Sequence, residues 1–374
     1  MITETVPASL QTQVAATEND DITKHLVRIW QELLGLESIT PDQNYFDLGG
    51  DSSIAVQMFA QIEKIFNVKL PLATLYDAPT VLELAQILRG ETSSSSGWSP
   101  LVTIQSEGSR PPIYCFHGAG GNVLNYRELS KHLGPDQPFY GLQSQGLDGS
   151  CAPLTKIEDM AALYVKEIRK VQPHGPYFLA GYCGGGTIAY EAAQQFQALG
   201  ESVGMVALFD TMDWSQIRLT FWNKSYYRSQ RLVFHAAEFM NLNWNDKSKF
   251  LKEKTTVLRN RIPVWKGMIS SKFGNKKSDT APSESSVLAQ IWQTNDRACE
   301  SYIPKPYPGV ITDFRPAKQY RIFNKPNLKW DRLAREQKVV TLPVYPASML
   351  LEPFVQQLAA SLRNSMDAVI SANK

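Results

Sequence analysis

A short polar run divides this chain into two parts that differ in charge and in the spacing of their apolar residues. The run reads Glu91-Thr92-Ser93-Ser94-Ser95-Ser96-Gly97, and because none of these side chains can anchor a core, we interpret residues 91–98 as a flexible linker. Residues 1–90 hold 5 Lys and Arg against 12 Asp and Glu, whereas the whole chain of 374 residues carries only +2. We therefore expect two domains, an acidic one before the linker and a basic one after it.

The composition argues against several classes of protein. Only four cysteines occur, widely spaced and without CxxC pairs or clustered histidines, so neither a disulfide framework nor a metal site is expected. No stretch approaches the roughly 20 apolar residues that a membrane-spanning helix needs, and the N-terminus has no signal pattern. No basic run with interleaved aromatic residues occurs, so nucleic acid is not an expected partner. These features predict a soluble, cytoplasmic protein.

Residues 20–90 have the apolar spacing of a small helical bundle. One stripe of a predicted helix collects four apolar side chains, those of Ile54, Met58, Ile62 and Ile65. Thr80 and Glu83 form a capping box at the start of another helix, and a further helix is expected from Ile22 to Leu34. Residues 1–19 are low in large apolar side chains, so we expect them to form a flexible tail.

A serine follows a pair of glycines at the start of one of these helices, in Leu48-Gly49-Gly50-Asp51-Ser52-Ser53-Ile54. The glycines permit a sharp turn, and the Ser52 hydroxyl would lie at the positive end of the helix, where a phosphate is favoured. An ordinary helix cap would show the same short motif. The acidic charge around it fits either docking on basic faces of partner enzymes or plain solubility.

The flanks of this motif extend the pattern through Ile29–Leu34, Tyr45-Phe46-Asp47 and Leu75–Val81. With these flanks, residues 20–90 resemble the carrier domains of nonribosomal peptide synthetases. The resemblance implies that Ser52 carries a covalent 4'-phosphopantetheine arm, attached by a phosphopantetheinyl transferase, whose thiol holds an acyl substrate as a thioester. It also implies an upstream adenylation domain or other synthetase modules as partners.

Residues 99–368 alternate between short apolar runs and helical stretches. The strand candidates are residues 112–116, 177–181, 203–209, 310–314 and 339–344, and helical stretches include residues 187–197 and 352–362. This alternation predicts a mainly parallel sheet covered by helices on both faces. Between about 214 and 300 it lapses into a basic, aromatic-rich insertion, which we expect to form a helical lid over a pocket.

The run Tyr177-Phe178-Leu179-Ala180-Gly181-Tyr182-Cys183-Gly184-Gly185-Gly186 leads from an apolar strand through a glycine-rich turn into a helix. It is the G-x-S-x-G nucleophile elbow with a cysteine in place of the serine. Cys183 is therefore expected to project above the sheet at a helix N-terminus, which lowers the pKa of a thiol. Taken alone, the same residue could be a buried structural cysteine.

Other features of this part agree with a nucleophile. The loop His117-Gly118-Ala119 follows an earlier strand, and the N–H groups of Ala119 and Gly184 are the expected oxyanion donors. Asp210 closes a further strand, where an orienting carboxylate belongs. Together with Ser348-Met349-Leu350-Leu351-Glu352-Pro353, these residues make the segment 99–365 similar to the type I thioesterase domains that end such synthetases, which implies an α/β-hydrolase fold.

The resemblance fails at one position. The family places its catalytic histidine where this chain has Pro346, and no histidine follows His235. His235 lies in the lid and could act only if the lid folds over the site, while His117 adjoins the oxyanion loop and is a possible auxiliary residue. A thiol depends less on a base than a hydroxyl does, so Cys183 is expected to accept an acyl group. Hydrolysis of the acyl-cysteine should be slow, because general-base help is worth about 10² to 10⁴ in rate.

These arguments favour an enzyme in which the carrier domain delivers its thioester to Cys183 and release occurs by condensation or acyl transfer. Family precedents are domains that join two aryl 2-keto acid units through carbon–carbon bonds, and a cysteine-bearing shuttle of aminoacyl groups between carriers. Two alternatives stay open. The chain could be a hydrolytic or macrocyclising thioesterase with a relocated base, or a catalytically degenerate module that only binds a carrier.

Overall fold

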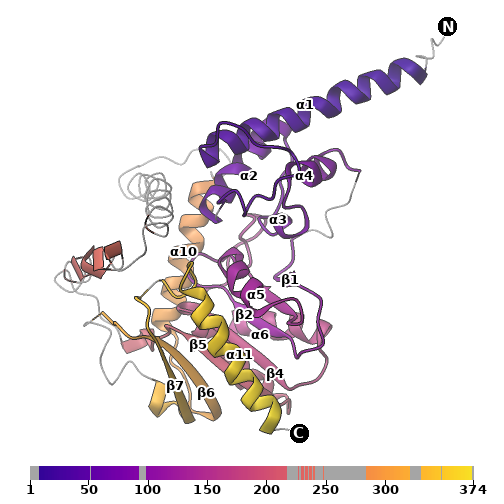
Figure 1. The fold of residues 1–374 in the computed structure, drawn as a ribbon. Helices are drawn as coiled ribbons and strands as arrows, with labels where there is room; N and C mark the ends of the chain where they lie inside the picture. The colour runs from indigo at the N-terminus through magenta and orange to yellow at the C-terminus, as the bar shows by residue number, and fades with distance from the viewer. Residues whose placement is uncertain are drawn as a thin grey trace, which may run out of the picture. The chain divides into compact units, whose positions relative to one another are not determined.

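The computed structural model describes residues 8–50, 52–91, 98–216, 284–320, 330–346 and 348–372, and single positions between 226 and 247. The chain forms two compact units, Met1–Trp98 and Ser99–Lys374 (Figure 1). None of the described helices is both long and apolar enough to cross a bilayer.

The first unit is a bundle of four helices, α1 (Ala8–Leu34), α2 (Ser52–Phe66), α3 (Thr74–Asp77) and α4 (Val81–Leu88). Its core is built from fully or almost fully buried side chains, including Leu26, Trp30, Met58, Ile62 and Leu84. The predicted capping box is present, since Thr80 Oγ1 accepts a hydrogen bond from the N–H of Glu83 and the Glu83 carboxylate accepts one from the N–H of Thr80. The predicted helical carrier fold is thus confirmed.

Two details of this unit differ from the sequence-based expectation. Helix α1 begins at Ala8, so most of the predicted tail, residues 1–19, is helical. No glycine or proline occurs between Ala8 and Leu34, and nothing in that stretch stops a helix. Ile65 is 49% exposed, because periodicity assigns a residue to a face but does not ensure that another element covers the last turn.

The second unit is built on a seven-stranded sheet of order β1-β3-β2-β4-β5-β6-β7. The strands are β1 (Leu101–Gln105), β2 (Ile113–Phe116), β3 (Phe139–Leu142), β4 (Tyr177–Tyr182), β5 (Val203–Phe209), β6 (Tyr307–Pro316) and β7 (Ala334–Leu342). Only β1 runs antiparallel to its neighbour among these strands. All five predicted strands are confirmed, and the arrangement is the expected α/β-hydrolase type.

Helices cover both faces of this sheet, as predicted. Helices α6 (Ile157–Val171) and α7 (Gly184–Ala198) pack against each other, and α5 (Arg127–Leu133) packs against α11 (Val355–Ala372). Helix α10 (Glu284–Ser301) is the described end of the predicted lid, most of which lies outside the described residues. The described residues of this unit also form single-turn helices at Leu124–Tyr126, Trp214–Gln216 and Trp330–Arg332.

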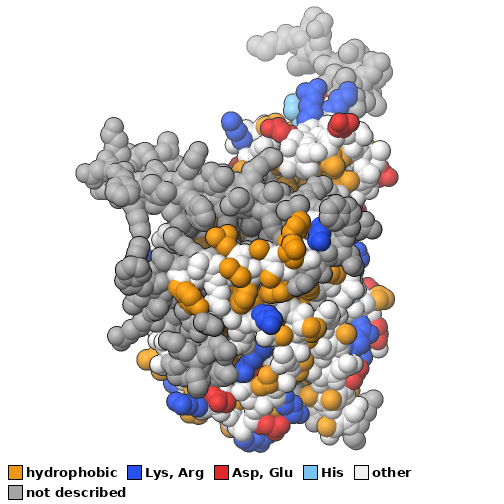
Figure 2. All heavy atoms as spheres, turned by 60° about the vertical axis from the view of Figure 1, so that its left-hand side comes forward, with side chains coloured by type: hydrophobic (Ala, Val, Ile, Leu, Met, Phe, Trp, Pro, Cys, Tyr) orange, Lys and Arg blue, Asp and Glu red, His pale blue; other side chains and the backbone are white. Residues whose placement is uncertain are grey.

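The centre of the sheet positions the site. Residues Tyr177 to Gly181 of β4 are all buried, and so are residues 184–193 of the helix that follows. Because strand and helix are both fixed by the core, the turn between them has little freedom to move. On the face shown in Figure 2, hydrophobic side chains gather near the centre of the view, beside atoms that are not described.

Candidate active site

Cys183 occupies the turn between β4 and α7 and has a strained backbone. Its φ of 55° and ψ of −120° fall in a region that non-glycine residues rarely adopt, at a cost of about 1–3 kcal/mol. Two hydrogen bonds hold the turn: the N–H of Cys183 donates to the Phe209 carbonyl at 2.9 Å, and Thr211 Oγ1 donates to the Cys183 carbonyl at 3.0 Å. The strain and these bonds are typical of a nucleophile elbow.

The glycines around Cys183 are required by close backbone approach. A Cβ atom on Gly181 would lie 2.1 Å from the carbonyl carbon of Gly185, and one on Gly185 would lie 2.2 Å from the Phe116 carbonyl oxygen. A Cβ atom on Gly186 would lie 2.1 Å from Thr211 Oγ1. Any larger residue would therefore push the helix away from the sheet, which explains the pattern that the sequence shows.

The loop after β2 lies against the elbow and is tied to it. The Tyr126 hydroxyl donates to the Phe116 carbonyl at 2.6 Å and accepts from the N–H of Tyr182 at 2.9 Å, so it joins the ends of β2 and β4. Asn295 Nδ2 of α10 donates to the Ala119 carbonyl at 3.0 Å. These contacts hold the loop and the elbow together next to the peptides that carry the predicted oxyanion donors.

The surroundings of Cys183 keep its thiol protonated. Although the residue is only half-buried, burial of the sulfur and the nearby Asp210 carboxylate raise the pKa of Cys183 to about 12. The N–H of Gly184 acts in the opposite direction, and the Asp296 carboxylate adds to the rise. The expectation that the helix N-terminus would make this thiol more acidic is therefore wrong, because desolvation and two carboxylates outweigh one N–H group.

Asp210 lies directly after β5, where the sequence predicted a carboxylate. Its φ is 46°, its N–H donates to the Phe314 carbonyl at 3.0 Å, and the residue is half-buried. Its charge acts on the Cys183 sulfur, so the fold brings the two predicted residues together.

His117 is fully buried, and its ring bonds to the oxyanion loop and to Tyr164. Its Nδ1 lies 2.7 Å from the Gly118 carbonyl oxygen and its Nε2 lies 2.8 Å from the Tyr164 hydroxyl. Since a carbonyl can only accept, Nδ1 carries the proton and Nε2 accepts from Tyr164. Burial lowers the pKa of His117 to about 4, and the ring is neutral at pH 7. With both nitrogens engaged, His117 has no nitrogen left to act as a base.

Two further positions bear on the search for a base, Pro346 and His235. Neither provides an imidazole in the part of the chain that the structure describes. Pro346 is buried shortly after β7, and His235 lies outside the described residues. Among the described residues, the charged groups that act on the Cys183 sulfur are the carboxylates of Asp210 and Asp296, and no imidazole is among them.

Helix α10 contributes a set of site residues that the sequence analysis did not single out. The ring of Trp292 would lie 3.5 Å from a Cβ atom on Gly120, and the Cys299 sulfur would lie 2.8 Å from a Cβ atom on Gly184. Between them Asn295, only 2% exposed, bonds to the oxyanion loop as described above. The spacing i, i+3, i+4, i+7 of Trp292, Asn295, Asp296 and Cys299 was the signal in the sequence that could have revealed this face.

In the first unit, the structure begins α2 at Ser52. Gly49 before it has a φ of 88°, and a Cβ atom on Gly50 would lie 2.4 Å from the buried Tyr45 ring, so both glycines are needed for the turn. The turn leaves Ser52 at the N-terminus of a 15-residue helix, where the helix dipole favours a phosphate. The residues present fit a phosphopantetheine attachment site.

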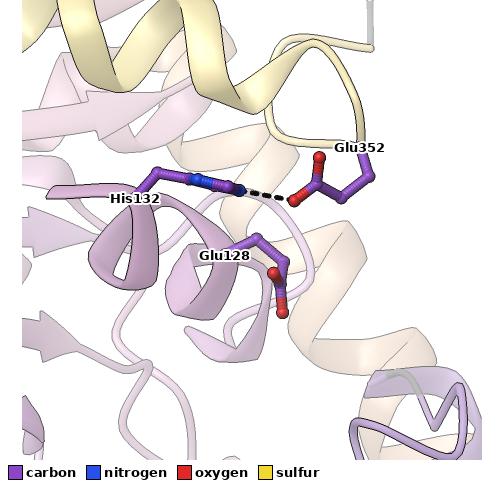
Figure 3. Close-up of side chains that lie close together, drawn as sticks. All are labelled: Glu128, His132 and Glu352. Atoms are coloured by element: carbon purple, nitrogen blue, oxygen red, sulfur yellow. Dashed lines mark hydrogen bonds and ion pairs between the residues drawn. The ribbon is translucent and has the colours of Figure 1, made fainter. Parts of the chain in front are cut away.

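A second cluster of titratable side chains, drawn in Figure 3, lies between α5 and the segment before α11. His132 Nε2 is 2.5 Å from Glu352 Oε1, and Glu128 pairs with Arg127 at 2.5 Å. Gln356 donates to the other oxygen of Glu352 at 3.0 Å. Because every member already has a protein partner, we interpret the cluster as an ion-pair network. The expectation of no metal site stays a prediction.

The second unit is thus an α/β-hydrolase-type enzyme domain with a cysteine at its nucleophile elbow, and the first is a helical carrier-type domain with a serine at a helix start. Comparison with known families agrees with both. Residues 24–88 match the phosphopantetheine attachment site family, and residues 111–286 match the thioesterase domain family. The chain is a carrier domain followed by a thioesterase domain of the kind found in nonribosomal peptide synthetases and related synthetases.

Several synthetases are similar to this chain. Malpibaldin synthetase from Mortierella alpina is 40% identical over 197 residues, 52% of this chain and 4% of that protein. Indigoidine synthase from Dickeya dadantii is 37% identical over 198 residues, 53% of this chain and 13% of that protein. An atromentin synthetase from Paxillus involutus is 29% identical over 181 residues, 47% of this chain and 19% of that protein.

A solved structure of a four-domain nonribosomal peptide synthetase, bound to AMP and glycine, matches 92% of this chain with a TM-score of 0.56 and 26% identity. The match takes up 26% of that structure. The chain therefore spans only a small part of each protein that it resembles here.

Proposed function

We propose that an acyl group loaded on the carrier domain is transferred to Cys183, and that an acceptor other than water then releases it. The observation that carries this proposal is the cysteine at the strained N-terminus of α7, combined with a buried proline at residue 346. The thioesterases that this chain resembles have a histidine at that position. Without an imidazole partner a cysteine can still exchange one thioester for another, because the proton it loses can pass to the departing thiol, whereas attack by water on the acyl-cysteine needs a base.

Ser52 is the residue to which the phosphopantetheine would be attached. When bound, the arm presents the acyl group as a thioester and lets it reach a distant site. A phosphopantetheinyl transferase must modify Ser52, and an adenylation domain must supply the acyl group, because neither activity has a counterpart in the residues described above.

In the first step the Cys183 sulfur attacks the acyl carbon of the delivered thioester. A new S–C bond forms at Cys183, the old C–S bond breaks, and the proton that leaves Cys183 ends on the departing thiol. The N–H groups of Ala119 and Gly184 would stabilise the negative oxygen of the tetrahedral intermediate. Since one thioester replaces another, the exchange is close to balanced in energy.

In the second step the acyl-cysteine waits for its acceptor. Attack by water needs proton removal, and no imidazole among the described residues acts on Cys183. An aryl 2-keto acid has a C–H bond that is more acidic than the O–H bond of water, so its carbanion forms more readily. This carbanion attacks the acyl carbon, a carbon–carbon bond forms, the C–S bond breaks, and the proton lost from carbon ends on the Cys183 sulfur. The likeness to an atromentin synthetase fits this release.

The first test loads the full chain with phenylacetyl-coenzyme A and a phosphopantetheinyl transferase, and follows the acyl group by mass spectrometry of the intact and digested protein. We expect phenylacetyl to appear on Ser52 phosphopantetheine and then on Cys183, where it persists. Cys183→Ala should keep the group on the carrier, and Ser52→Ala should abolish loading.

Three results would contradict the proposal in different ways. Rapid release of phenylacetic acid would identify a hydrolytic thioesterase with a relocated base. A loaded carrier whose acyl group never reaches Cys183 would identify a module that only binds carriers. Transfer unaffected by Cys183→Ala would show that another residue is the nucleophile.

A further inference from the structure

The oxyanion loop, residues 117–121, turns sharply at the residue that carries its predicted donor. The N–H of Gly121 donates to the Gly118 carbonyl at 3.0 Å, so residues 118–121 form a β-turn with Ala119 and Gly120 at its two central positions. Neither central residue has a positive φ, and the peptide bonds of the turn are trans. Among the regular hydrogen-bonded turns these conditions leave type I, in which Ala119 has helical dihedral angles.

The dihedral angles of Ala119 decide which way its two polar groups point. In a helical conformation the N–H and the C=O of one residue point in opposite directions, whereas in an extended conformation they point to the same side. In the type I turn the Ala119 carbonyl therefore points away from the side on which the Ala119 N–H would meet the oxyanion. Rotation of the peptide between Ala119 and Gly120 would give a type II turn and bring that carbonyl oxygen to the N–H side, where it would repel the oxyanion.

Gly120 makes this rotation possible. A type II turn needs a positive φ at the third position of the turn, and glycine adopts one without steric cost. Close packing does not require a glycine here, because a Cβ atom on Gly120 would lie 3.5 Å from the Trp292 ring, an ordinary contact distance. The loop thus contains a peptide that can flip, and a contact from outside the turn can select its orientation.

Helix α10 provides such a contact through Asn295. Asn295 Nδ2 donates to the Ala119 carbonyl oxygen at 3.0 Å, and because a carbonyl can only accept, this bond fixes the orientation of the amide. The same helix packs on the rest of the turn, since Trp292 lies against Gly120 and a Cβ atom on Gly121 would lie 2.6 Å from Ile291 Cγ2. Helix α10 therefore contacts the three consecutive residues 119–121.

The Asn295 side chain is costly to bury. It is only 2% exposed, and its Oδ1 has no hydrogen-bond partner among the described residues. A buried acceptor left without a partner costs free energy that an apolar side chain of similar size would not cost. The hydrogen bond to Ala119 is therefore the interaction that an amide provides at this position and a leucine could not.

We propose that Asn295 is a positioning residue for acyl transfer, whose amide holds the Ala119–Gly120 peptide so that the Ala119 carbonyl stays out of the oxyanion site. This inference rests on the proposed function, in which the Ala119 N–H stabilises the tetrahedral intermediate. Asn295 acts through Ala119 and exchanges no proton. Its role adds no base to the site, so hydrolysis of the acyl-cysteine stays slow.

The test compares two reactions of Cys183 in the full-length protein. Transfer of phenylacetyl from the loaded carrier passes through an oxyanion, whereas alkylation by iodoacetamide displaces iodide from a saturated carbon and does not. Asn295→Leu should slow transfer by about 10- to 100-fold, up to the effect of losing one oxyanion donor, and leave alkylation unchanged. A merely structural role would alter both rates. Gln293→Leu is the matched control, because it removes an amide from an exposed position of α10 and should change neither rate.

Gly120→Ala tests the peptide flip itself. Alanine fits the type I turn at this position but disfavours the positive φ of type II. Added to Asn295→Leu, it should therefore restore transfer by about fivefold or more, measured against Gly120→Ala alone.

Two results would overturn the inference and leave the proposed function intact: transfer at the unmodified rate in Asn295→Leu, or no recovery of transfer when Gly120→Ala is added to it. Equal slowing of transfer and alkylation in Asn295→Leu would also overturn it, in favour of a structural role. If no acyl group reaches Cys183 even in the unmodified protein, the proposed function itself fails, and the positioning role fails with it.

Discussion

At the scale of single residues, the Cys183 thiol is the most consequential feature. Burial and the Asp210 carboxylate raise its pKa to about 12, above the value of about 8.5 for an unperturbed thiol. In the proposed acyl transfer, loss of the Cys183 proton should therefore be a costly part of the first step.

This environment predicts how Cys183 reacts with small electrophiles. Only the thiolate reacts with iodoacetamide, so the rate at Cys183 should rise about tenfold per pH unit between pH 6 and 10, without a plateau. An unstructured cysteine peptide, with a thiol pKa of about 8.5, should level off in the same range. Peptide mass spectrometry separates Cys183 from the other three cysteines. A plateau at Cys183 below pH 8 would mean that the helix N-terminus dominates after all.

His117 predicts an acid-sensitive contribution to stability. Its pKa is about 4 in the folded protein and 6.5 in its ordinary state, so the unfolded chain binds the proton more tightly. The stabilisation is complete above pH 6.5 and is lost as the pH falls towards 4, by up to roughly 3 kcal/mol. Comparison of urea unfolding at pH 7 and pH 4.5 should show a smaller pH effect in His117→Gln, which cannot titrate. An equal pH effect in both proteins would contradict this account.

At the scale of elements, α10 and α7 pack closely where the Cys299 sulfur lies next to Gly184. A Cβ atom on Gly184 would lie 2.8 Å from the Cys299 sulfur, which is buried and cannot move aside freely. Gly184→Ala should therefore destabilise the enzyme domain by about 1–3 kcal/mol, as overpacking generally does. Cys299→Ala should recover part of that loss in the double variant, measured as a coupling energy in a thermodynamic cycle of urea unfolding. Strictly additive effects would show that the two helices do not meet there.

The same elements show how much of the fold can be predicted from the sequence alone. Continuous apolar runs reveal β2, β4 and β5, because strands buried on both faces are apolar throughout, while shorter apolar runs mark only part of β6 and of the mostly exposed β7. The half-exposed edge strand β1 and the four-residue β3 give no such signal. The elbow can be recognised in the sequence because close packing requires its glycines. The α10 stripe was missed, since its contacts with Gly120, Ala119 and Gly184 join segments far apart in the chain.

At the scale of the whole molecule, the chain consists of two units that each have their own buried core. The proposed transfer from Ser52 to Cys183 joins chemistry in one unit to chemistry in the other. We predict from their composition that residues 91–97 form a flexible linker, and a short linker of this kind would give the two sites an effective concentration in the millimolar range.

Separating the units should therefore slow acyl transfer without abolishing it. With residues 1–98 and 99–374 produced as two proteins at about 10 μM each, transfer of phenylacetyl to Cys183 should be about 10- to 100-fold slower than in the intact chain. The rate should rise in proportion to the concentration of the carrier piece, and carrier made with Ser52→Ala should give none. Circular dichroism of each piece establishes that it is folded before the comparison. Equal rates in the separated and intact proteins would mean that tethering contributes nothing, and that the enzyme domain receives its acyl group as readily from any carrier in solution.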